Sequence, residues 1–140
     1  MSEEVIESIF DFSADISSQE APPPIPKGKY LASITSAVPK TSVNTGNRYA
    51  DVTFTISPDQ FPPDFASVQS DAVNLHHRTL VIKDDARSRY NIRRFCEAVR
   101  APVGRKFDLN DLIGKTAMLT IDHRQYQGVD QAEIKQVEAA

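Results

Sequence analysis

The sequence contains little of what disulfide-bonded, membrane or secreted proteins need. Cys96 is the one cysteine in 140 residues, so no disulfide can form within the chain, and this is typical of a reducing compartment. The apolar runs are only a few residues long, far short of the roughly 20 that a transmembrane helix requires. The N-terminus begins with acids where a secretory signal has a basic flank and an apolar stretch. We expect a cytoplasmic protein with no membrane partner.

The common motifs of catalysis are also missing. The sequence has no Walker loop, no GxSxG, no HExxH and no Cys/His cluster. The adjacent His76 and His77 could stack on bases or ligate a metal, but a metal site needs further ligands at a suitable spacing. The pair Asp122 and His123 has no nucleophile in view. We therefore expect no enzyme activity, no cofactor and no metal.

Charge is unevenly distributed along the chain. The net charge is −3, yet residues 1–20 hold six acids and no base, so the remaining 120 residues hold 13 acids against all 16 Lys and Arg, a net of +3. Between Arg78 and Lys106 there are nine bases and three acids. Because local potential decides whether a polyanion is attracted, the negative total does not exclude a nucleic-acid partner.

The organisation that follows is one domain with an N-terminal extension. Residues 1–20 mix acids with scattered apolar residues and are expected to form a flexible acidic tail. The prolines of "APPPIP", residues 21–26, favour an extended spacer. Residues 27–140 are long enough to bury a core of their own. We divide the chain into 1–26, tail and spacer, and 27–140, the domain.

Two strands joined by a hairpin loop open the domain. From Tyr30 to Val38 the residues alternate, with Tyr30 and Val38 on one face and Leu31 and Ala37 on the other. Residues 49–56 alternate more clearly, with Ala50 and Phe54 on the apolar side. The sequence "NTGN" supplies the turn, since Asn and Gly tolerate positive φ.

The rest of the chain predicts three more strands and a helix. Residues 57–72 are rich in proline and should pack back through Phe61 and Phe65, and a third strand covers 73–82. A helix follows, capped by Asp84 and Asp85 and stopped by Pro102. Its apolar face comprises Ile92, Phe95, Cys96 and Val99. Strands at 116–123 and 129–137 flank the loop "RQYQG". The order β-β-β-α-β-β predicts an all-β fold with one helix, an OB-fold-like five-stranded barrel; another small β-barrel or an α+β sandwich are the alternatives.

"IPKGKYLASITSAVPKTSVNTGNRYADVTFTI" and "DLNDLIGKTAMLTI" together resemble a family of small phage proteins, largely of unknown function and in part regarded as single-stranded-DNA-binding. The resemblance covers residues 26–137 and is weakest in the proline-rich segment. It rests on Pro26, Gly28, Tyr30, Thr41, Gly46, Asn47 and Tyr49, and on Leu109, Leu112, Gly114 and Lys115. It implies an OB-like fold, single-stranded DNA as partner, a role in phage replication or recombination, and the host cytoplasm. Residues 1–20 have no counterpart in that family.

Single-strand binding requires cations along the phosphates and aromatic rings under the bases. OB-folds bind over strands two and three, between the loops that join strands one to two and four to five. Both of these predicted loops carry an Arg and a Tyr. The candidate nucleic-acid contacts are Lys40, Asn47, Arg48, Tyr49, Thr53, His77, Arg78, Arg124 and Tyr126.

Two functions compete at this point. The first is a single-stranded DNA-binding protein with low sequence specificity, whose residues 1–20 recruit a replication or recombination protein or shield the basic surface. The second is a protein-interaction module on the same barrel, which the low aromatic content of 8% and the lack of Trp favour. A homodimer paired through edge strands is compatible with either.

Overall fold

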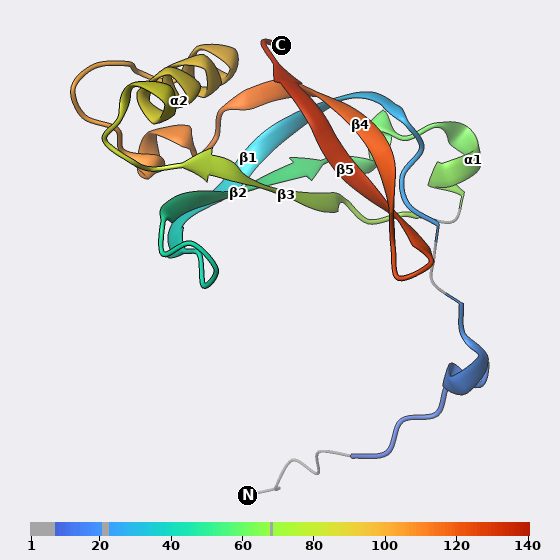
Figure 1. Cartoon of the computed structure of the whole chain (residues 1–140). Coiled ribbons are helices and arrows are strands. Elements are labelled where there is room, and N and C mark those ends of the chain that lie inside the picture. The colour runs from blue at the N-terminus through green and yellow to red at the C-terminus, as the bar shows by residue number, and fades with distance from the viewer. Residues whose placement is uncertain (1–7, 21–22, 68) are drawn as a thin grey trace, which may run out of the picture.

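Five antiparallel strands form one open sheet in the computed structural model, which describes residues 8–20, 23–67 and 69–140. The strand order across the sheet is β3-β2-β1-β4-β5, as Figure 1 shows. The strands are β1 (Gly28–Thr41), β2 (Arg48–Ile56), β3 (Val73–Val81), β4 (Thr116–Tyr126) and β5 (Val129–Glu138), and helix α2 (Ala86–Val99) lies between β3 and β4 in the chain. The predicted element order and the mostly β class are confirmed.

The long central strand β1 changes partner and face along its length. Its first half pairs with β4 and its second half with β2, and a bulge interrupts the β2 pairing between Ile34 and Ser36. An extra residue in a strand moves every later side chain to the opposite face. Ala37 is therefore buried and Val38 is 44% exposed. The prediction that Val38 lies on the same face as Tyr30 was wrong for this reason.

The core lies on the inner face of the curved sheet, and α2 covers one end of it (Figure 1). The predicted apolar row of β2 is confirmed, since all four of its members are fully buried: Ala50, Val52, Phe54 and Ile56. Phe95, Cys96 and Val99 of α2 are buried against them, and the Phe95 ring meets Phe54 edge-on, 6.3 Å between centroids. The helix begins at Asp85, whose Oδ1 accepts from the Ser88 N–H at 2.8 Å. Asp84, predicted to share this cap, pairs with Arg89 instead.

Short helical segments complete the fold. They are η1 (Ile16–Ser18), η2 (Pro58–Gln60), α1 (Pro63–Ala66) and η3 (Leu109–Leu112). As predicted, the proline-rich segment packs back on the domain through Phe61 and Phe65, which are buried with ring centroids 5.1 Å apart. No helix in the described part of the chain has the length and apolar character to cross a membrane.

The loop predicted at residues 124–128 is a tight turn. β4 extends to Tyr126 and β5 begins at Val129, so Gln127 and Gly128 alone connect them, with φ of 52° and 78°. Positive φ at both central residues is the conformation of a two-residue hairpin turn whose twist matches the strands. Arg124 and Tyr126 therefore lie on β4, and the prediction that they lie in a loop was wrong.

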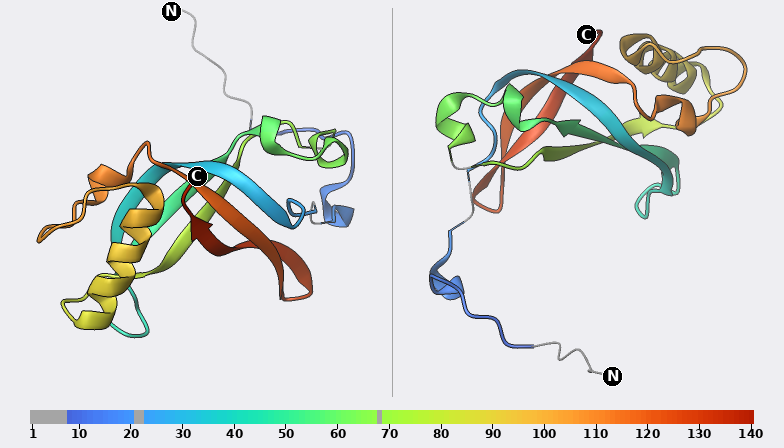
Figure 2. Two further views of the ribbon diagram at one scale, coloured as in Figure 1. Left: turned by 90° about the horizontal axis from the view of Figure 1, so that it is seen from above. Right: turned by 180° about the vertical axis from the view of Figure 1, so that it is seen from behind.

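The two hairpins project toward the same side of the molecule from opposite ends, with β2 and β3 between them (Figures 1 and 2). One is the β1–β2 loop, residues 42–47, and the other is the β4–β5 turn. The N-terminal segment leaves the domain at the end away from α2. Its described residues 8–20 are all exposed, and Ile25 is the first buried residue of the described chain.

Candidate nucleic-acid interface

A buried carboxylate lies at the centre of the polar face of β2. Asp51 alternates with Ala50 and Val52, so its side chain points away from the core, yet it is only 2% exposed. β2 lies between β1 and β3, and long side chains from both neighbours cover this position. The alternation of residues 49–56 places Asp51 opposite the apolar row, but alternation gives the side of a strand and not what covers it.

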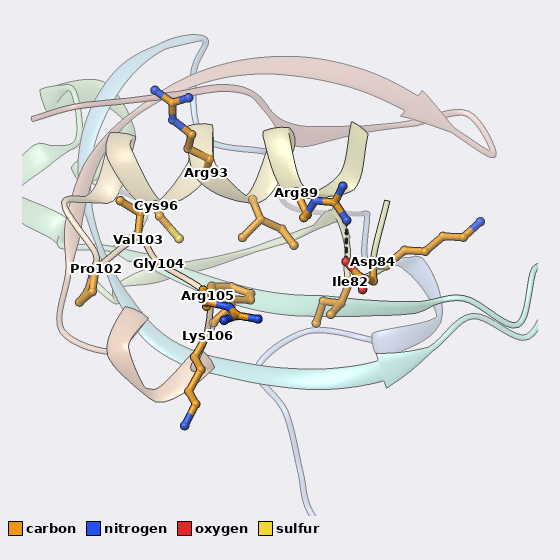
Figure 3. Close-up of a pocket in the computed structure, with 13 residues that line it drawn as sticks. Ile82, Asp84, Arg89, Arg93, Cys96, Pro102, Val103, Gly104, Arg105 and Lys106 are labelled. Carbon is orange, nitrogen blue, oxygen red and sulfur yellow. Dashed lines mark hydrogen bonds and ion pairs between the residues drawn. The ribbon is translucent and has the colours of Figure 1, made fainter. Parts of the chain in front are cut away.

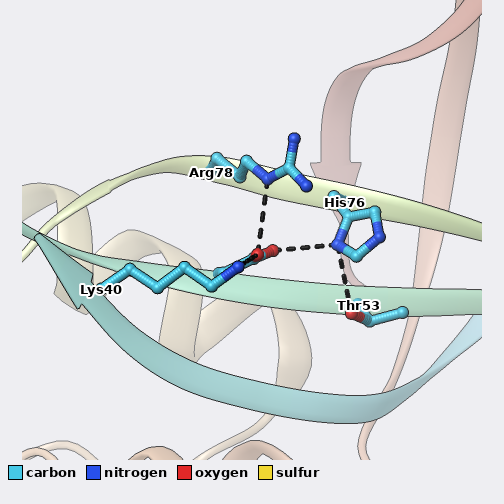
Figure 4. A network of polar contacts seen from close by, with 5 residues as sticks. Lys40, Thr53, His76 and Arg78 are labelled. Atoms are coloured by element: carbon cyan, nitrogen blue, oxygen red, sulfur yellow. Dashed lines mark hydrogen bonds and ion pairs between the residues drawn. The ribbon is translucent and has the colours of Figure 1, made fainter. Parts of the chain in front are cut away.

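Three cationic or polar groups from the neighbouring strands converge on this carboxylate (Figure 4). Lys40 Nζ of β1 lies 2.8 Å from Asp51 Oδ2, and Arg78 Nε of β3 lies 3.4 Å from the same oxygen. His76 Nδ1 is 3.0 Å from Oδ1 and 3.3 Å from the Thr53 hydroxyl. We call these five residues the Asp51 network. Burying a carboxylate is tolerated only when it is paired and hydrogen-bonded in this way.

The network holds Asp51 in its charged form. Burial alone raises the pKa of the carboxyl, but the hydrogen bonds from Lys40 and His76 and the charge of Arg78 outweigh burial and lower the pKa from 3.8 to about 2. A lowered folded-state pKa contributes stability that is present above the unfolded pKa and is lost as pH falls through the folded one.

We expect Asp51→Asn to destabilise the protein by about 2 kcal/mol at neutral pH, because the asparagine amide resembles the protonated carboxyl and the shift of the Asp51 pKa converts to that amount. The difference from the native chain should shrink between pH 4 and pH 2. Urea unfolding of both chains at pH 7, 4 and 2.5 measures it. A difference that does not change with pH would mean that the substitution removes packing rather than charge.

The cations of the network keep unused hydrogen-bond donors. The Lys40 and Arg78 side chains are 48% and 56% exposed. Among the residues that the structure describes, Arg78 uses Nε toward Asp51 and leaves both terminal nitrogens of its guanidinium for another acceptor. Asp51 thus fixes two cations at a defined separation, with donors turned to solvent. Guanidinium and ammonium groups arranged in this way suit phosphate oxygens.

A hollow of about 480 Å³ continues this surface at the base of the β1–β2 loop. Asn47 and the half-buried Tyr49 line it together with Arg78 and Val81. The loop closes on itself through the Ser42 carbonyl, which accepts from the N–H of Gly46, a residue with φ of 72°. The structure therefore brings together Lys40, Asn47, Tyr49, Thr53 and Arg78 of the predicted contacts.

A row of hydroxyl and amide groups extends the polar face along β2. The hydroxyls of Thr35 and Thr55 lie 2.9 Å apart, and the Thr55 hydroxyl donates to Asn74 Oδ1 at 2.7 Å. The sequence reasoning did not single out these three residues or Asp51 and His76 as a group. These residues come together because of the strand registers, which decide which residues of β1, β2 and β3 stand opposite each other.

The other predicted contacts lie elsewhere. Arg48 precedes Tyr49 on β2, so the strand alternation turns it to the opposite side. Arg124 and the 55% exposed Tyr126 belong to the β4–β5 hairpin, at the other end of β2 and β3. They flank the Asp51 network without touching it.

His77 faces the interior, whereas it was expected on or near the exposed surface with Arg78. Its ring lies 5.1 Å from that of Phe95 and 6.4 Å from that of Phe54, measured between centroids. Burial lowers the pKa of His77, which favours the neutral ring. Since His76 points to Asp51 on the other side of β3, the two histidines do not converge on a common ligand. We leave His77 out of the candidate interface.

Neither the models of known protein families nor the curated proteins give a match to this sequence. The resemblance of residues 26–137 to small phage proteins stays a prediction that rests on the residues quoted for it. The geometry of the polar face is thus the basis on which function has to be inferred.

Proposed function

We propose that this protein binds single-stranded DNA with little sequence preference, through the outer face of β2 and β3. The observation that supports this most strongly is the Asp51 network, which holds Lys40 and Arg78 half-exposed beside a hollow lined by Tyr49. Cations at fixed positions next to an aromatic ring are what single-strand binding requires. Because Asp51 already orders both side chains, binding a phosphate costs little further conformational entropy.

The fold that we propose is an OB-fold. Its hallmark is a five-stranded, partly open Greek-key barrel that binds oligonucleotides over strands two and three and through loops one–two and four–five. The sheet order, the helix between β3 and β4, and the approach of the edge strands β3 and β5 to each other all agree with it. The two hairpins project to the same side at the ends of β2 and β3 and would border the path of the strand.

Each group on this surface has a definite role in the proposal. Lys40 and Arg78 contact consecutive phosphates, and Tyr49 and Tyr126 offer rings for base stacking, each worth about 1–3 kcal/mol. The Thr53 hydroxyl and the Asn47 amide supply hydrogen bonds to sugars or bases. None of these groups selects one base strictly, so the expected preference is for single strands over duplex and not for a sequence. A role in phage replication or recombination, in the host cytoplasm, is part of the same proposal.

The test is fluorescence anisotropy of a labelled oligo-dT of about 30 nucleotides, titrated with the full chain at low and at moderate salt. We expect binding that weakens steeply with salt, because each phosphate contact releases counterions. A duplex of the same length should bind much more weakly. Absence of binding, equal binding to duplex, or binding that salt does not affect would contradict the proposal.

A further inference from the structure

A second pocket lies at the end of the domain that contains α2 (Figure 1), and none of the five residues of the Asp51 network lines it. It opens between α2 and residues 102–107 and encloses about 390 Å³ (Figure 3). Apolar side chains form much of its lining, among them Ile82, Ile92 and Phe107. We call it the helix pocket. Its apolar surface is accessible from outside, and none of the functions discussed so far uses it.

Cations dominate the rim of the helix pocket. Its lining contains five of them, Lys83, Arg89, Arg93, Arg105 and Lys106, against one acid, Asp84. Asp84 is already paired with Arg89, and Glu97 pairs with Arg93. Arg105 and Lys106 form no ion pair with any residue of the described ranges 8–20, 23–67 and 69–140. An apolar floor under a basic rim fits a peptide that combines acids with large apolar side chains.

The chain contains such a peptide. Residues 9–16 read "IFDFSADI", and residues 8–20 contain acids but no base. Their apolar side chains are among the most exposed of the described chain: Ile9 80%, Phe10 72%, Phe12 67% and Ile16 69%. Exposed aromatic and aliphatic residues grouped in one short segment are typical of an interaction site.

We propose that residues 9–16 of one copy dock in the helix pocket of a second copy. Phe10 and Phe12 fill the apolar floor, and Asp11 and Asp15 meet the cations Arg105 and Lys106. The partner is therefore another molecule of this same chain. The proposal does not depend on DNA binding, because the helix pocket and the Asp51 network share no residue.

The positions of the N-terminal segment and of the helix pocket in the fold favour docking between two copies over docking within one molecule. The N-terminal segment joins the domain before Gly28, where β1 begins, whereas Lys106 and Phe107 lie beside Ala37 to Pro39 near its end. Its own segment would have to run back along most of β1, roughly 30 Å, in an extended form. A second copy can present the segment without stretching the spacer, at the cost of association, which the dependence on concentration measures. Because the segment leaves the domain at one end and the helix pocket lies at the other, the contact between copies is heterologous. Copies therefore add head to tail.

Two variants that complement each other test the proposal. Phe10→Ser/Phe12→Ser removes the apolar anchors and leaves the pocket intact, whereas Arg105→Glu/Lys106→Glu damages the pocket and leaves the segment intact. Sedimentation velocity without DNA should show that the native chain associates further as concentration rises. Each variant alone should associate at least about tenfold more weakly, since it loses buried aromatic surface or paired charge. An equal mixture of the two variants should form a one-to-one complex.

The control is Arg87→Glu/Arg94→Glu, which makes the same change in charge on α2 outside the helix pocket and should associate like the native chain. Circular dichroism melts of all the variants verify that they fold. A native chain that stays monomeric at every concentration would overturn the proposal, even if its segment docks in the helix pocket of the same molecule. Association that the Arg105→Glu/Lys106→Glu variant retains, or a mixture that forms no complex, would overturn it as well.

Discussion

Replacing Lys40, Asp51 and Arg78 together, as Lys40→Gln/Asp51→Asn/Arg78→Gln, is expected to weaken binding to single-stranded oligo-dT by about 100-fold. The two cations each make one charge-assisted phosphate contact in our account, worth about 1.5 kcal/mol, and 1.4 kcal/mol corresponds to a factor of ten in affinity. The dependence of log K on log salt should also become less steep, by about 0.7 for each lost contact to a single strand. Anisotropy titrations at three salt concentrations measure both quantities.

Asp51 is included in this variant because removing the two cations alone would leave a buried carboxylate with the His76 ring as its remaining partner among the described residues. Replacing all three groups by neutral polar ones leaves no stranded charge, so the variant should stay folded. Arg87→Gln/Arg94→Gln removes two cations from α2 and serves as the matched control. If this control weakens binding as much as the triple variant does, the effect comes from total charge and the assignment of the interface is wrong.

Phe54→Ala is expected to destabilise the domain by about 4 kcal/mol, the usual range for a large aromatic side chain in a core. Phe54 is fully buried in β2, between β3 and β1 in the sheet, and its ring contacts both Phe95 of α2 and His77 of β3. Its loss therefore leaves a cavity at the junction of helix and sheet. Since small domains have only about 5–15 kcal/mol of stability, this is a large fraction of the total.

Urea unfolding followed by circular dichroism measures this effect, and Phe12→Ala is the matched control. Phe12 is 67% exposed, so at a protein concentration where the chain is monomeric the same substitution there should alter the unfolding free energy by less than about 0.5 kcal/mol. A cost for Phe54→Ala below about 1 kcal/mol would mean that β2 and α2 do not share the core described above.

The sequence predicted those elements whose signal is local and regular. The alternation of residues 49–56 gave the buried row of β2, and the spacing of Phe95, Cys96 and Val99 gave the buried face of α2. Both follow from the fixed periods of strand and helix. The order of five strands and a helix could be predicted because each element has its own periodic segment and turn residues separate these segments.

What the sequence did not predict depends on irregularities and on register. The bulge at Thr35 reverses the faces of the second half of β1, and no residue type announces it. The dipeptide Gln127–Gly128 is not one of the pairs that usually mark a two-residue turn, so the hairpin was predicted with too long a loop.

The candidate site could be predicted only in part, because it also depends on strand register. Tyr49 and Arg78 were identified by residue type and by their expected strands. Lys40 was identified as a cation of the first loop, whereas it lies on β1. The position of Asp51 between Lys40 and Arg78 depends on how three strands align, which a single sequence does not specify. His77 was misplaced because alternation over a short third strand did not establish which of two adjacent histidines faces the core.

The most direct test of the central claim is to map the bound strand on the protein by NMR. At 15.6 kDa the chain is of a size for which amide signals can be followed one by one during titration with oligo-dT. We expect the largest shifts at Lys40, Tyr49, Asp51, Thr53 and Arg78, smaller ones at the β4–β5 hairpin, and none in α2. Shifts confined to α2 and residues 102–107, or no shifts at all at saturating DNA, would contradict the proposal that β2 and β3 form the binding face.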